Sequence, residues 1–248
     1  MLNDRMMRTQ SAVLLALAAL VAPVSGARAD AQPQVVVELF TSQGCSSCPP
    51  ADSYLGELAQ RPDVLALAFH VDYWNYIGWT DPYASKLATQ RQRDYSRHLN
   101  LRYVYTPQMV INGASEGVGS ERLAIAPLIK TAEDEKQLSQ PVSISRAADG
   151  KLAIHVDAGA AREPATLWLV GFDREHSTEV LHGENEGQTL KEYQVVRSCE
   201  AVATWRGEAL DLALPGNKPA GEGGVAVLLQ IGGTGHIIGA ALLKPPES

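Results

Sequence analysis

The chain has 248 residues, of which 45% are apolar and 20% are charged, and its formal net charge is −7. This acidic balance, without any block of Lys and Arg, argues against nucleic acid or anionic lipid as a partner. The length is sufficient for one large domain, or for two small domains that each have a hydrophobic core, and we favour two domains.

The N-terminus predicts a secretory signal peptide over residues 1–29. Two arginines precede an apolar run over residues 12–21, and Ala27-Arg28-Ala29 has the small-x-small pattern of a cleavage site. An uncleaved membrane anchor is the alternative, but the run is shorter than the roughly 20 residues that cross a bilayer. We therefore expect a periplasmic or secreted protein with no membrane span after signal cleavage, in an oxidising compartment where disulfides persist.

The next part of the chain, residues 30–140, has an α/β pattern. An apolar run over residues 35–40 predicts a strand, residues 49–59 have helical spacing, and residues 64–71 predict a second buried strand. Strand, helix and strand in this order predict a βαβ unit. Further along, the pattern predicts a helix over 82–98, a strand that enters a turn at Asn112-Gly113, and a helix over 123–138.

Residues 141–248 differ in their sequence pattern from the preceding part of the chain. They contain short β-rich segments separated by Gly and Asp or Asn turns, which predict a β-sandwich of about 105 residues. The expected strands are residues 142–145, 152–156, 166–170, 194–196 and 225–231. Pro141 marks the expected domain boundary.

Cys45 and Cys48, separated by two serines, are the most informative pair in the chain. They follow the first strand and precede a helix, and a helix N-terminus carries about half a positive elementary charge that stabilises a thiolate. This placement predicts thiol–disulfide exchange, in which an exposed Cys45 attacks and Cys48 resolves the mixed disulfide. A purely structural bridge is the alternative, but closing so short a loop removes little entropy from the unfolded chain.

Glu38 lies in the middle of the first strand, and two interpretations of it remain open. A carboxylate pointing under the helix that carries the thiols would have a raised pKa and could accept a proton from Cys48. Strand alternation could equally turn it toward solvent, because charged residues are seldom fully buried without a partner.

Thr106-Pro107 is a candidate substrate-binding element. A cis bond before proline costs only about 0.5–1 kcal/mol, and a cis-proline beside the thiols would expose the backbone of Thr106 to an extended peptide. An ordinary trans proline at the start of an edge strand is the alternative. Trp74 belongs to an aromatic stretch that would either form a platform for an unfolded peptide or pack the following helix onto the sheet.

In their order along the chain these features resemble the thioredoxin fold, and longer blocks of sequence resemble an exported bacterial family catalogued as domain of unknown function 1223. The blocks are residues 38–52, 69–74, 78–82, 105–113 and 183–185. The resemblance implies an α/β thioredoxin-like domain over residues 30–140, followed by a mainly-β, sandwich-like domain over residues 141–248. It also implies that Pro107 is cis and faces the cysteines, and that Glu38 corresponds to a buried acid beneath them.

The sequence therefore predicts an exported thiol–disulfide oxidoreductase that acts on protein thiols or disulfides, works with a redox partner protein and needs no dissociable cofactor. One alternative is a copper or zinc site made by Cys45, Cys48 and His70. Another is a non-catalytic binding scaffold whose cysteines stay oxidised. Cys199 is the odd cysteine, and we expect it to be simply buried.

Overall fold

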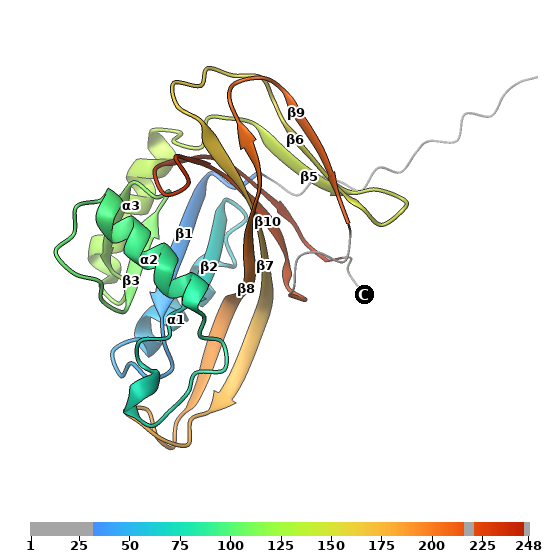
Figure 1. Cartoon of the computed structure of the whole chain (residues 1–248). Coiled ribbons are helices and arrows are strands. Elements are labelled where there is room, and N and C mark those ends of the chain that lie inside the picture. Colours follow the sequence, from blue (N-terminus) through green and yellow to red (C-terminus); the bar gives the residue numbers. More distant parts are fainter. Residues whose placement is uncertain (1–31, 216–220, 246–248) are drawn as a thin grey trace, which may run out of the picture.

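The computed structural model describes residues 32–215 and 221–245, and Figure 1 shows how its strands and helices are arranged. The predicted signal peptide lies outside the described residues. The strands are β1 (Val35–Thr41), β2 (Val64–His70), β3 (Gln108–Ile111), β4 (Ser115–Val118), β5 (Val142–Arg146), β6 (Leu152–Val156), β7 (Ala165–Glu179), β8 (Thr189–Trp205), β9 (Leu210–Leu214), β10 (Gly224–Ile231) and β11 (Ile237–Leu243). The helices are α1 (Pro49–Leu58), α2 (Lys86–His98), α3 (Arg122–Asp134) and the short 3₁₀ turn η1 (Asn75–Ile77).

The predicted fold class, a thioredoxin-like α/β domain followed by a separate β-sandwich, is wrong. Eight strands form one mixed sheet in the order β11-β10-β7-β8-β2-β1-β3-β4, so strands from both predicted domains share it. β8 joins the two halves, because it lies parallel to β2 and pairs with it at Ala68 and Val195. The described residues thus form a mostly-β fold with three α-helices on the large sheet. The residue ranges proposed for two domains stay a prediction.

The βαβ unit at the start of the described chain is confirmed. β1 and β2 are parallel, in a register that runs from Val35 opposite Val64 to Thr41 opposite His70, and α1 connects them. All residues of both strands are buried, as their continuous apolar runs predict for strands covered on both faces.

Alternation along β1 and β2 divides their side chains between two layers. Val35, Val37 and Leu39 pack with α1 and α3 in one apolar cluster. The intervening residues Val36 and Phe40 pack on the other face with α2. This division decides which polar residues of these strands can reach the helix that carries the cysteines.

A second, three-stranded sheet in the order β5-β6-β9 covers the part of the large sheet made by β7, β10 and β11. β7 and β8 are far longer than the segments 166–170 and 194–196 that the sequence predicted. In Figure 1 they run as one long ribbon beside β2, and the loop joining them lies near η1. The pair thereby connects the small sheet to the cysteine end of the molecule.

The Asn112-Gly113 turn joins two antiparallel strands, β3 and β4, so the predicted hairpin signal is confirmed. Its two residues have φ values of 48° and 65°, which is the conformation that Asn and Gly tolerate best. α2 begins at Lys86, after the capping residue Ser85 and later than predicted, and α3 ends at Asp134, four residues before the predicted end. Within the described part of the chain, the helices are all too short or too polar to cross a membrane.

Candidate functional site

The site is built around a disulfide between Cys45 and Cys48, whose Cα atoms lie 5.4 Å apart. β1 ends at Thr41, and two successive turns over residues 42–48, here called the CxxC loop, lead into α1. Cys48 is the N-cap residue of that helix, and two prolines occupy its first turn. Proline is well suited to this position because a first-turn N–H has no intrahelical partner to lose.

Both cysteines are buried, so the expectation of an exposed Cys45 is wrong. The exposed fraction is 1% for Cys45 and 0% for Cys48, whereas Ser46 and Ser47 between them face solvent. The surroundings of Cys45 are nevertheless polar, since its Sγ lies 3.4 Å from the hydroxyl oxygen of Ser47. Neither sulfur belongs to the apolar clusters that the described strands and helices form.

Burial of the CxxC loop comes in part from the tip loop, residues 180–188, which joins β7 to β8. The side-chain amide of Asn185 donates to the backbone carbonyls of Gln43 (2.8 Å) and Cys45 (3.1 Å). The carboxylate of Glu184 accepts from the N–H of Ser46 (3.1 Å) and from its hydroxyl (2.7 Å). A segment about 140 residues away in the chain therefore holds the backbone around the disulfide.

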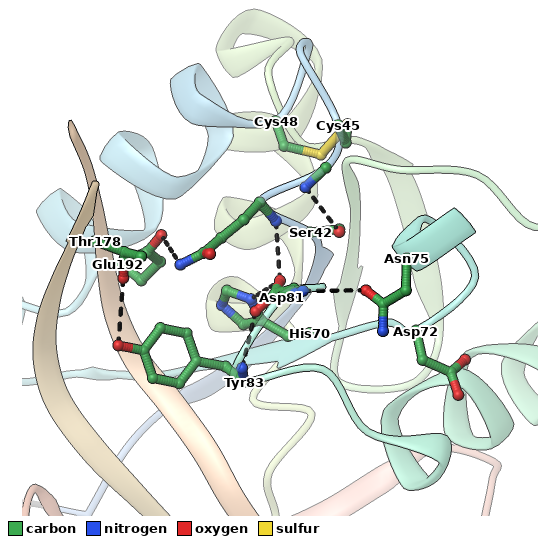
Figure 2. A network of polar contacts seen from close by, with 12 residues as sticks. Ser42, Cys45, Cys48, His70, Asp72, Asn75, Asp81, Tyr83, Thr178 and Glu192 are labelled. Atoms are coloured by element: carbon green, nitrogen blue, oxygen red, sulfur yellow. Dashed lines mark hydrogen bonds and ion pairs between the residues drawn. A yellow bond between two sulfur atoms is a disulfide. The ribbon is translucent and has the colours of Figure 1, made fainter. Parts of the chain in front are cut away.

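A buried polar network lies below the disulfide, as Figure 2 shows. Asp81 Oδ2 accepts from His70 Nδ1 (2.7 Å) and from the backbone N–H of Gln43 (2.9 Å). The Gln43 side chain donates to Glu192 Oε1 (2.8 Å), which connects the CxxC loop to β8. Two buried atoms of this network, His70 Nε2 and Glu192 Oε2, lack a hydrogen-bond partner among the described residues.

His70 and Asp81 form an ion pair in this network. Burial alone would lower the pKa of His70, but the Asp81 carboxylate outweighs it and raises this pKa above its ordinary value. Burial alone would raise the pKa of Asp81, but His70 and the N–H groups of Gln43 and Tyr83 lower it below its ordinary value. Each of the two groups therefore stabilises the charged form of the other.

Two further buried acids close to this ion pair have raised pKa values. Burial raises the pKa of Asp52, on α1, to about 7, against partial compensation by His70. Burial likewise raises the pKa of Glu192. Among the described residues, no ion pair joins either acid to a cation, although His70 lowers both pKa values in part and His176 lowers that of Glu192.

Glu38 lies on the opposite face of the sheet from α1, so the expected position under the thiols is wrong. Its carboxylate is fully buried, accepts from Arg91 Nε (2.6 Å) and also accepts from the hydroxyl of Tyr95, both on α2. Gln230 on β10 donates to Tyr95 and accepts from Arg91, which closes the group. Strand alternation explains the placement, because Glu38 is in phase with Val36 and Phe40. Its predicted role as a proton acceptor remains untested.

The peptide bond between Thr106 and Pro107 is cis. Pro107 is buried and Thr106 half-buried, and the Thr106 hydroxyl accepts from the indole N–H of Trp74 (2.8 Å). Trp74 in turn packs against the CxxC loop, since a Cβ atom placed on Gly44 would lie 3.0 Å from that of Trp74. The structure therefore links these candidate substrate-binding residues to the loop through Trp74.

Among residues 32–215 and 221–245, no group of three or more His, Cys, Asp or Glu side chains is arranged to hold a metal ion. Of the three ligands in the metal hypothesis, the two sulfurs are joined in a disulfide, and His70 uses Nδ1 to bind Asp81.

Sequence reasoning assigned no role to Asp52, Asp81, Glu184, Asn185 or Glu192. The first four lie in the blocks 38–52, 78–82 and 183–185 that carry the family resemblance, so their presence there was an available signal. Glu192 has no such signal, because only the pairing of the long β7–β8 hairpin places it beside Gln43.

Comparison with known proteins gives a family and a fold. A family model described as "Protein of unknown function (DUF1223)" matches residues 36–230. A crystal structure of an Agrobacterium tumefaciens protein is 37% identical, with a TM-score of 0.77, and the match covers 89% of this chain and 98% of that one. HBP35 of Porphyromonas gingivalis is 14% identical, with a TM-score of 0.59 over 88% of this chain and 76% of that one, a likeness of fold alone. None of the curated proteins matches.

Proposed function

This chain belongs to the DUF1223 family, and we propose that it is an exported thiol–disulfide oxidoreductase that exchanges its Cys45–Cys48 bridge with thiols or disulfides of other proteins. The observation that carries the proposal is the position of this bridge, at the N-terminus of α1 and only three residues in span. A bridge over so short a loop stabilises the fold by only about 2 kcal/mol in the chain-entropy model, against about 4.7 kcal/mol for a 100-residue loop.

The reaction is written here in the direction that oxidises a substrate dithiol. A substrate thiolate attacks Cys45 Sγ, the S–S bond breaks, and Cys48 leaves as a thiolate. A second substrate thiolate then attacks the mixed disulfide and releases Cys45. The bridge gains the two electrons that the substrate loses, and the two thiol protons of the substrate end on Cys45 and Cys48.

The surroundings of Cys45 support its role as the attacked and attacking sulfur. Ser47 Oγ lies 3.4 Å from its Sγ and can donate to a thiolate there. The loop is also close to the N-terminal end of α1, whose dipole favours negative charge. Cys48 is one turn further and has no exposed surface.

Burial of Cys45 sets a condition on this function, because a substrate sulfur must reach it. The tip loop closes the CxxC loop through an exposed hydrogen bond to Glu184 and buried hydrogen bonds from Asn185. We therefore expect exchange to require displacement of the tip loop, with Thr106 and Trp74 on the exposed side available to an extended peptide.

Export follows in the proposal from the predicted signal peptide over residues 1–29, and an oxidising compartment is where such a bridge persists. The expected partners are protein thiols or disulfides and a redox partner that regenerates the bridge.

The test is to trap a mixed disulfide with the full mature chain. A Cys48→Ala variant should form a covalent adduct through Cys45 when it is mixed with a peptide disulfide. A Cys45→Ala variant should form none, and Cys199→Ala, which alters a cysteine outside the site, should keep wild-type exchange. The proposal is overturned if the wild-type protein exchanges with neither thiols nor disulfides under conditions where glutathione reduces exposed bridges. That result would favour the alternative of a non-catalytic binding scaffold.

A further inference from the structure

The exchange reaction requires a proton to reach or leave Cys48, and the backbone around this residue offers little to stabilise its thiolate. Pro49 and Pro50 carry no N–H. The next two N–H groups of α1, from Ala51 and Asp52, both donate to the carbonyl of Cys48 (2.8 and 3.1 Å). The first turn of the helix therefore has no free N–H to give to the sulfur.

Asp52 lies one helical turn after Cys48, at the i, i+4 spacing that places two side chains on the same face of a helix. It is buried, and it lies on the side of α1 that faces the sheet. His70 is in phase along β2 with Ala66 and Ala68, which pack against α1. Asp52 and His70 therefore share one interior layer with the cysteine end of the helix.

The charges around Asp52 come from three other elements. His70 faces it from β2, Asp81 from the segment after η1, and Glu192 from β8. The rings of Tyr83 and His176 stack on each other. The charge of His176 lowers the pKa of Glu192 in part. Asp52, Asp81 and Glu192 thus all act on His70, and among the described residues only Asp81 forms an ion pair with it.

We propose that Asp52 is the group that exchanges a proton with Cys48 when the bridge is reduced or formed. The proposal rests on the proposed function, because it concerns a step of that reaction. During reduction, Cys48 Sγ leaves as a thiolate and takes the proton of the Asp52 carboxyl group, which becomes a carboxylate facing His70. A proton released by the substrate thiols then returns to Asp52, so that both substrate protons are accounted for. During bridge formation, the Asp52 carboxylate takes the proton of the Cys48 thiol, and the resulting thiolate attacks the mixed disulfide at Cys45.

Glu38, to which one of the two sequence interpretations gave this role, is less well placed for it than Asp52. Glu38 points to the other face of the sheet, and Arg91 and Tyr95 already hold both of its carboxylate oxygens. Asp52 has instead a pKa of about 7, which is close to the value that suits a group exchanging protons at neutral pH.

The test compares acid-to-amide substitutions in the full mature chain. Rates of bridge formation from a mixed disulfide on Cys45 are measured from pH 5 to 9 for wild type, Asp52→Asn and Glu38→Gln. Glu57→Gln is the matched control, since it makes the same change at an exposed position of the same helix. Circular dichroism checks that each variant is folded.

In the wild type the rate should rise up to about pH 7 and then level off. In Asp52→Asn it should be about a hundredfold lower at neutral pH, and it should keep rising by about tenfold per pH unit, because Cys48 must then ionise without help. Asp52→Glu should restore part of the plateau. Glu57→Gln and Glu38→Gln should retain the wild-type profile.

Time-resolved infrared spectra of the wild type during reduction supply a second measurement that needs no variant. They should show a transient loss of a protonated aspartic carboxyl band as Cys48 takes up its proton, identified by isotope labelling of aspartate. An unchanged pH profile in Asp52→Asn, or no change of that band, would overturn the role of Asp52 while leaving the exchange activity in place. Absence of exchange in the wild type would instead overturn the proposed function.

Discussion

Glu184 accepts two hydrogen bonds from Ser46, one from its N–H and one from its hydroxyl, although the two residues are 138 positions apart in the chain. Ser46 lies between the two cysteines, and Glu184 lies at the end of the long β7–β8 hairpin. These bonds lower the pKa of Glu184 below its ordinary value. The contact is therefore charge-assisted, and it fixes the closed position of the tip loop over the disulfide.

Weakening this contact should make the disulfide easier to reach. In Glu184→Gln the side chain keeps its size but loses its charge, and we expect the rate of bridge reduction by a small thiol to rise by roughly tenfold. Asn185→Ala, which removes both bonds to the carbonyls of Gln43 and Cys45, should have a larger effect. Stopped-flow reduction with excess dithiothreitol measures both rates.

Glu186→Gln is the matched control for the tip loop, because it removes one negative charge from an exposed neighbouring position. It should reduce at the wild-type rate. Equal rates in wild type, Glu184→Gln and Asn185→Ala would mean that the tip loop does not limit access to Cys45.

The buried pair of Glu38 and Arg91 should contribute to stability and not to exchange. Glu38→Gln leaves the Arg91 guanidinium buried without its counter-charge, and loss of one partner of such a pair costs about 3–5 kcal/mol. We therefore expect the free energy of unfolding in urea to fall by about that amount, while the reduction potential of the bridge stays at the wild-type value.

A double variant tests whether the pair itself causes this loss. Glu38→Gln combined with Arg91→Met should lose clearly less stability than the sum of the two single changes, because no unpaired charge remains. Breaking the exposed pair of Glu57 and Arg122 with Glu57→Gln should leave stability almost unchanged. A shift of the reduction potential in Glu38→Gln would contradict the separation of the two faces.

The local elements near the cysteines could be predicted from the sequence, because their signals are local. Continuous apolar runs mark β1 and β2, two prolines after Cys48 mark the start of α1, and Asn112-Gly113 marks a hairpin. Each of these signals depends on residues that are neighbours in the chain.

Relationships across long distances in the chain could not be predicted in the same way. Hydrogen bonding between β2 and β8 joins the two halves into one sheet. The residue pattern within a strand does not indicate which other strand it pairs with. Burial of Cys45 depends on Asn185 and the rest of the tip loop, and the face occupied by Glu38 depends on the register of β1. The fold class, the exposure of Cys45 and the face occupied by Glu38 were therefore the points at which the sequence misled.

The thiol of Cys199 should be unreactive in the folded protein. It lies in the apolar layer under α2, and burial raises the pKa of its thiol to about 11, so very little thiolate is present at neutral pH. We expect Ellman's reagent to detect no thiol in the oxidised native chain and one thiol after unfolding in guanidinium, since the other two of the three cysteines form the bridge. Rapid native labelling would contradict this placement.

Asp52 should make the stability of the oxidised protein fall as the pH rises. Its pKa is about 7 in the folded state and 3.8 in its ordinary environment, so between these values the folded state binds more protons than the unfolded state. Stability then decreases with increasing pH over this window. His70, whose pKa is raised, acts in the same direction at higher pH, because its contribution is complete below pH 6.5 and is lost as the pH passes its folded value.

Substitution of Asp52 by Asn removes this titration while keeping the size of the side chain. The difference of about 3 pKa units corresponds to about 4 kcal/mol, so Asp52→Asn should gain up to that much stability relative to wild type between pH 4 and pH 8. Urea unfolding of the oxidised wild type and variant at several pH values measures the difference. Glu57→Gln, on the same helix but exposed, should show no such gain. Parallel stability curves for wild type and Asp52→Asn would mean that the Asp52 carboxyl group ionises normally in the folded protein.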